Sequence, residues 1–121
     1  MARKLCLAFS IFMVFCATSV LAEELFGIKV YPGASYDATT SNKLKDAMRV
    51  EAACFRTNDS VTKVVAFYKT QPGLKAVGEA DKEGGMFRKG YVDVTIQNPW
   101  MDMATGKMMV STLISIVQQK E

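Results

Sequence analysis

The sequence predicts an α+β protein: a small antiparallel sheet with one amphipathic helix packed on one face and a β-hairpin near the C-terminal end. Three observations lead to this class. Residues 61–68 carry apolar side chains at helical spacing, several other segments alternate between apolar and polar residues, and residues 104–107 have the composition of a hairpin turn. Because the strands are segregated from a single helix, a layered α+β arrangement is favoured.

Residues 1–22 have the pattern of a secretory signal peptide. An Arg-Lys pair precedes an apolar run, and Val20 and Ala22 stand at the −3 and −1 positions of a cleavage site. The alternative is an uncleaved membrane anchor, but the apolar run is short for a span and two glutamates follow it. We therefore expect cleavage after Ala22, a periplasmic or secreted location, and a single α+β domain over residues 23–121 with no membrane span.

Composition narrows the chemistry that the chain can perform. The formal net charge of +3 falls to about +1 once the two basic residues of the leader are removed, and the remaining charges are scattered, which argues against a nucleic-acid partner. The chain has no histidine, so it lacks Ser-His and Cys-His nucleophile pairs and the common zinc sites. We expect a protein that is not an enzyme and that carries no cofactor.

The first part of the domain reads as short extended segments and turns. Residues 28–30 alternate as a short strand would, and the Tyr-Pro-Gly-Ala sequence at residues 31–34 has turn chemistry. Residues 37–46 are polar and are expected to form a loop. Residues 47–57 alternate between apolar and polar side chains and are expected to form a half-buried strand, in which Cys54 is a buried small hydrophobe.

The clearest predicted element is a helix. Val61, Val64, Val65 and Tyr68 fall at i, i+3, i+4 and i+7, which is one apolar stripe of an amphipathic helix. A polar group at residues 58–60 can cap its start, and the Pro-Gly pair after it stops the helix.

Three further segments complete the predicted sheet. Residues 74–90 are expected to form an irregular strand with a turn around Gly84 and Gly85, and residues 92–97 alternate clearly. Residues 108–119 are rich in β-branched side chains and are expected to form the last strand. The turn at residues 104–107 joins these last two strands as a hairpin.

Several of these pieces together resemble a group of small secreted bacterial proteins. The shared features are the sequence "GIKVYPGA", the sequence "ACFRTNDSVTKVVAFYK" with its Phe-Tyr near the helix end, and a terminal hairpin with "TGKMMVSTLISI". The group has a Tyr-Pro-Gly-Ala turn, a strand that ends in Thr and a helix that ends in Phe-Tyr. The resemblance implies an extracytoplasmic bacterial setting and an α+β fold. It implies no activity and supplies no catalytic residue.

The segment with the most chemical character is "NPWMDMATGKMM", which contains the only tryptophan and four of the eight methionines. One interpretation is a binding patch for a protein partner, made by Trp100, Met101 and Met103, because methionine suits adaptable contact surfaces. The alternative is a site for Cu(I) or Ag(I), since thioethers are soft ligands. Its ligands would be Met101 and Met103, with Met109 or its neighbour Met108 supplying a third sulfur from across the hairpin and the ring of Trp100 over the ion.

A last candidate is a row of carboxylates. Glu79, Asp81 and Glu83 would project from one strand face if residues 79–83 were extended, which is the minimum that a hydrolase of the two-carboxylate kind requires. The same row would also be expected of a charged sheet edge that prevents aggregation, and we favour that interpretation.

Overall fold

The computed structural model describes residues 24–120, so the predicted signal peptide over residues 1–22 lies outside the described residues. The chain divides into two units, Met1–Pro32 and Gly33–Glu121. The described part of the first unit contains strands β1 (Glu24–Leu25) and β2 (Ile28–Lys29), which pair antiparallel. Phe26 and Gly27 between them both have positive φ, at 55° and 80°, as a two-residue type I′ turn requires.

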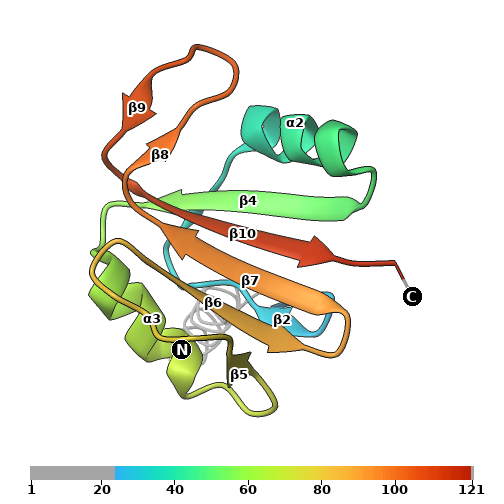
Figure 1. Cartoon of the computed structure of the whole chain (residues 1–121), viewed down its shortest axis with the longest axis vertical. Helices are drawn as coiled ribbons and strands as arrows, with labels where there is room; N and C mark the ends of the chain where they lie inside the picture. Colours follow the sequence, from blue (N-terminus) through green and yellow to red (C-terminus); the bar gives the residue numbers. More distant parts are fainter. Residues whose placement is uncertain (1–23, 121) are drawn as a thin grey trace, which may run out of the picture. The chain divides into compact units, whose positions relative to one another are not determined.

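The second unit contains an antiparallel six-stranded sheet in the order β3-β4-β10-β7-β6-β5 (Figure 1). Every neighbouring pair in this sheet is antiparallel, and with two helices the predicted α+β class is confirmed. The strands are β3 (Ser35–Tyr36), β4 (Glu51–Thr57), β5 (Lys75–Ala76), β6 (Gly84–Lys89), β7 (Val92–Gln97) and β10 (Thr112–Gln118).

Helix α3 (Val61–Lys69) is the predicted amphipathic helix, and it packs on one face of the sheet. Its buried residues are the four of the predicted stripe, and Ser60 caps its start by accepting a hydrogen bond from the Lys63 N–H at 3.1 Å. The ring of Tyr68 lies 6.2 Å from the ring of Phe87 in β6. The register places Phe87 beside Val94 of β7 and Val94 beside Ile116 of β10, so this apolar row forms the core beneath α3.

Helix α2 (Ala38–Met48) occupies the segment that the sequence predicted as a polar loop, so that prediction and the expectation of a single helix are wrong. Asp37 caps the helix, accepting hydrogen bonds from the Thr40 N–H at 3.0 Å and the Thr40 hydroxyl at 2.8 Å. The helix runs alongside β4, where the buried Ser41 hydroxyl accepts the Cys54 N–H at 2.7 Å (Figure 1). With Leu44 as its main apolar contact, α2 has no repeating stripe to predict it.

The two helices lie on opposite faces of the sheet. Side chains alternate between faces along a strand, and Ala53 is in register with Ile116 in the row beneath α3. Its neighbour Cys54 therefore points to the other face, where it contacts α2. This arrangement buries both faces of β4, so its middle residues, Ala52 to Phe55, are all buried instead of half-buried as expected.

Two predicted boundaries moved. Strand β4 begins at Glu51 and not at residue 47, because α2 continues to Met48 and Arg49 ends it in the left-handed conformation, with φ of 58°. Gly84 and Gly85 begin β6 and do not form a turn. A side chain at Gly84 would lie 2.8 Å from the Ile96 carbonyl oxygen, so glycine there permits close strand packing.

Strands β8 (Trp100–Met101) and β9 (Met108–Met109) form a separate two-stranded hairpin in the connection between β7 and β10. Figure 1 shows this β8–β9 hairpin extending past the ends of β7 and β10. Its turn closes through the Asp102 N–H donating to the Lys107 carbonyl at 2.9 Å and the Gly106 N–H donating to the Asp102 carbonyl at 2.7 Å. The predicted C-terminal hairpin and its turn are therefore confirmed, but the single last strand predicted over residues 108–119 is divided into β9 and β10, which belong to different sheets.

Candidate binding site on the β8–β9 hairpin

The β8–β9 hairpin has two faces of different character. Its register pairs Trp100 with Met109 and Met101 with Met108. Because successive side chains point to opposite sides of a strand, Trp100 and Met109 share one face, and Met101 and Met108 share the other. Trp100 is only 2% exposed, whereas Met101 and Met108 are 57% and 56% exposed. The hairpin therefore has one packed face and one face in solvent.

The packed face anchors the hairpin to the rest of the unit. Trp100 lies in a cluster with Cys54 of β4 and Leu113 of β10, and Leu44 of α2 and Met109 pack against it. These contacts are on the α2 side of the sheet. The tryptophan thus joins the base of the hairpin to a helix and to two strands at once.

The ion pair between Arg56 and Asp37 lies next to the buried Trp100 ring. The Arg56 guanidinium carbon lies 5.8 Å from the centre of the Trp100 ring, within the range of a cation–π contact. Arg56 Nε also lies 3.1 Å from Asp37 Oδ2, the residue that caps α2. The indole N–H donates to the Ser111 hydroxyl at 3.4 Å. The start of α2, the end of β4 and the hairpin are therefore connected through side-chain contacts of Asp37, Arg56 and Trp100.

The solvent face carries the exposed apolar groups. Met103, in the turn, is 53% exposed, and Val110, just after β9, is 84% exposed. Together with Met101 and Met108 they form what we call the methionine face: Met101, Met103, Met108 and Val110. Asp102 and Lys107 flank it, and Asp102 Oδ1 is engaged in the turn, where it accepts the Ala104 N–H at 2.9 Å.

The predicted site residues are distributed between the two faces. Met101 and Met103 are exposed as a binding role requires, but Trp100 is buried, so its predicted part in a partner surface does not fit the structure. Met109, the predicted third metal ligand, lies on the packed face, and the neighbour of Met101 across the hairpin is Met108. Counting outward from the predicted turn at residues 104–107 pairs residue 103 with residue 108, whereas the observed turn closes between Asp102 and Lys107 and so pairs Met101 with Met108.

The carboxylate row predicted at residues 79–83 does not exist. Strand β5 ends at Ala76, and Asp81 lies in a tight turn where its Oδ1 accepts the N–H groups of Glu83 at 2.9 Å and Gly84 at 3.0 Å. The strand face that would have aligned Glu79, Asp81 and Glu83 is therefore absent. Asp81 has a structural role in closing the turn.

Cys54 is a buried thiol, as the sequence predicted. It is fully buried, and its Sγ lies 3.5 Å from the Ser115 hydroxyl. Burial raises the pKa of the Cys54 thiol above its ordinary value, and hydrogen bonding to Ser115 only partly opposes this effect. The group that would react as a nucleophile is the thiolate, so the structure disfavours the reactive form.

An ion pair joins the neighbouring strands β6 and β7. Arg88 Nε donates to Asp93 Oδ1 at 2.6 Å, and the Gln119 side chain donates to Asp93 Oδ2 at 3.1 Å. Hydrogen bonding to Arg88 lowers the pKa of the Asp93 carboxyl, although its burial acts in the opposite direction. Asp93 is only 5% exposed, so this carboxylate is buried and is satisfied by its two partners.

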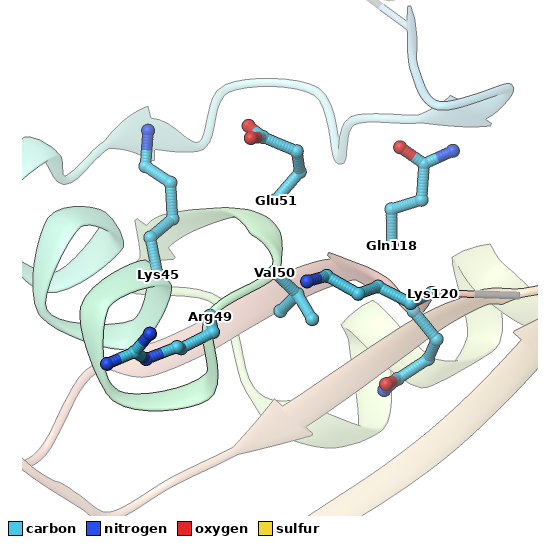
Figure 2. A pocket seen from close by; sticks show the side chains of 7 residues that line it. Lys45, Arg49, Val50, Glu51, Gln118 and Lys120 are labelled. Atoms are coloured by element: carbon cyan, nitrogen blue, oxygen red, sulfur yellow. The ribbon is translucent and has the colours of Figure 1, made fainter.

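A pocket of about 550 Å³ opens where the end of α2, the start of β4 and the end of β10 meet. Figure 2 shows Lys45 and Glu51 pointing to the same side and the Lys120 chain lying across the pocket near Val50. Lys45 is in the last turn of α2, where a cation is favoured by the helix dipole. The position of Lys45 in this pocket therefore has a structural explanation that requires no ligand.

Three observations bear on the class of protein. Within residues 24–120, no histidine, cysteine, aspartate and glutamate side chains gather in groups of three or more that could hold a metal ion. None of the helices described in that range has the length and apolar character needed to cross a membrane. Comparison with protein-family models, with curated proteins and with solved structures found no match in any of the three.

Proposed function

We propose that the protein is a small non-catalytic domain of the bacterial envelope, periplasmic or secreted, that binds a partner protein through the methionine face of the β8–β9 hairpin. The observation that carries the proposal is the exposure of four apolar side chains on one hairpin: Met101, Met103, Met108 and Val110. An exposed apolar patch of this kind is commonly an interaction surface.

The distribution of the other exposed apolar residues supports this choice of surface. The remaining large exposed apolar side chains are isolated from one another along the described chain, in β3, at the end of α2, after β5 and between β6 and β7: Tyr36, Met48, Val77 and Tyr91. Methionine side chains are flexible and polarisable, so they adapt to the shape of a partner. The anchoring of Trp100 on the opposite face holds the hairpin in place while its methionine face stays in solvent.

The non-catalytic part of the proposal rests on the state of the reactive groups. Asp93 is tied to Arg88 and Gln119, and Asp81 is tied to its own turn. Cys54 is buried with a raised pKa, and the sequence has no histidine to serve as a base. The envelope location rests on the signal-peptide pattern of residues 1–22.

The test is site-specific photo-crosslinking in the native host. A photoreactive residue replaces Met103 or Val110 in the hairpin, and Tyr91, which is 57% exposed between β6 and β7, is the matched control position. We expect one crosslinked protein that is captured from positions 103 and 110 and not from position 91.

A captured protein must then bind the purified chain in isolation. The double variant Met101→Ser/Met108→Ser should weaken that binding about ten-fold or more, because it removes both central contacts of the face, whereas Tyr91→Ser should leave it unchanged. Equal capture from all three positions, or equal affinity of both variants, would refute the proposal.

A further inference from the structure

The β8–β9 hairpin of the second unit carries three exposed methionine side chains within eight residues of the chain. Met101 and Met108 are direct neighbours across the hairpin, and Met103 follows two residues after Met101 in the turn. All three side chains are more than half exposed. We propose that Met101, Met103 and Met108 form a binding site for one monovalent soft cation, Cu(I) or Ag(I). This site uses the methionine face but does not depend on a partner protein.

The geometry allows two sulfurs to reach one ion. Directly opposed residues of an antiparallel pair have Cβ atoms about 4.5–5.5 Å apart. A methionine side chain is unbranched and has three rotatable bonds, so each sulfur can turn toward a point between the two strands. Met109, the ligand expected from the sequence, cannot share this point because it packs on the face of Trp100.

The chemistry of the three ligands sets the choice of ion. Thioethers are soft, neutral ligands, so they prefer Cu(I) or Ag(I) to hard cations. They also prefer these ions to metals that are usually bound by carboxylate or imidazole groups. The charged residues next to these methionines in the chain are Lys107, which opposes a cation, and Asp102, which offsets it. Because no ligand has to lose a proton, affinity should be the same at pH 5.5 and pH 7.5, unlike that of thiolate or imidazole sites.

Two other residues are excluded as ligands by their positions. Cys54 would bind a soft ion more tightly than a thioether, but it is fully buried in the folded protein. Trp100 is buried on the opposite face of the hairpin with Arg56 at its ring, so it does not cover the ion as the sequence suggested. Its position next to Met101 in the chain nevertheless makes its fluorescence a useful reporter.

The experiment is an Ag(I) titration of the exported and processed protein, labelled with ¹³C at the methionine methyl groups and followed by NMR. We expect the signals of Met101, Met103 and Met108 to shift and to saturate at one equivalent, while those of Met48 and Met86 stay in place. Met48 is the internal control, because it is also exposed but lies at the end of α2.

A pair of variants tests the assignment by calorimetry. Met101→Leu/Met108→Leu should raise the dissociation constant about ten-fold or more, because two of the three sulfurs are lost. Met48→Leu/Met86→Leu should leave it unchanged. A Cys54→Ala variant should bind silver as tightly as the wild type, because the buried thiol takes no part in the site.

The proposal is overturned if both double variants bind silver equally, if all exposed methionines shift together, or if binding disappears in the Cys54→Ala variant. These results leave the proposed partner function untouched, because the titration contains no partner. Conversely, crosslinking performed with a Cu(I) chelator present would test partner binding without the ion.

Discussion

Neighbouring residues of the β8–β9 hairpin differ sharply in what they contribute. Trp100 is buried in a cluster with Cys54 and Leu113, and Met101 beside it is 57% exposed. The difference follows from strand geometry, since adjacent side chains point to opposite faces. The residue that anchors the hairpin and the residue proposed to bind are therefore adjacent in the same short strand.

Replacement of Trp100 should show this division directly. Trp100→Ala should reduce the free energy of unfolding by about 3–5 kcal/mol, the usual cost of removing a large buried aromatic side chain. Met101→Ala should change it by about 0.5 kcal/mol or less, because an exposed side chain loses little on truncation. Urea unfolding followed by circular dichroism measures both, and equal losses would contradict the anchoring role of Trp100.

Asp93 should make stability depend on acid pH. Its folded pKa is lowered, first by the hydrogen bond from Arg88, so the ionised carboxylate stabilises the native state. That contribution is fully present above the unfolded pKa of about 3.9 and is lost as the pH falls through the lower folded pKa. Asp93→Asn should therefore lose less stability than the wild type when the pH falls below about 4.

The measurement is a series of urea unfolding curves between neutral and strongly acid pH. Asp46→Asn is a suitable control, because Asp46 is exposed on α2. If the wild type and Asp93→Asn keep a constant difference in stability through the acid range, the Arg88 hydrogen bond does not hold the carboxylate ionised.

Among the secondary-structure elements, the two helices show what a sequence pattern can and cannot predict. Helix α3 was predicted because Val61, Val64, Val65 and Tyr68 form a continuous apolar stripe that the sheet buries. Helix α2 was missed because it packs through one leucine and a buried Ser41 hydroxyl, which leave no hydrophobic period. Hydrogen bonds to another element depend on the tertiary fold, and local patterns do not record them.

The hairpin itself was predictable, but the roles of its residues were not. The turn and the two arms follow from local composition. The burial of Trp100 depends on α2, which supplies Leu44 to the cluster. Because the sequence pattern does not predict α2, it does not predict the burial of Trp100 either. The choice between Met108 and Met109 depends on the register, which a shift of one residue reverses.

The cap of α2 offers a test of how that helix is held. Asp37→Ala should cost about 1 kcal/mol, because it removes the hydrogen bonds to Thr40 at the start of the helix. Asp37→Asn should cost much less, since asparagine caps equally well and the ion pair with the partly exposed Arg56 contributes little. Chemical unfolding gives both values, and equal losses would mean that the ion pair matters more than the cap.

For the second unit as a whole, the β8–β9 hairpin is an addition to a sheet that is already complete. Strands β7 and β10 pair with each other along their length, and the hairpin lies in the connection between them (Figure 1). The apolar core under α3 contains no residue of the hairpin. The fold should therefore tolerate large sequence changes in residues 101–108, which lie between Trp100 and Met109.

Shortening the hairpin tests this independence. A variant in which residues 101–108 are replaced by Asn-Gly keeps Trp100 and Met109 as a pair on either side of a two-residue turn. We expect its free energy of unfolding to stay within about 1 kcal/mol of the wild type, because the removed side chains are mostly exposed. Partner capture and silver binding should both be lost, whereas cooperative unfolding lost with them would show that the hairpin supports the core.

The two faces of the hairpin can also change in sequence independently of each other. A tip that is fastened by one buried indole can exchange its outward-facing residues without disturbing the anchor. Related or engineered chains could carry aromatic, charged or metal-binding tips on the same base. The connection between β7 and β10 is thus the natural place to graft a new recognition loop onto this scaffold.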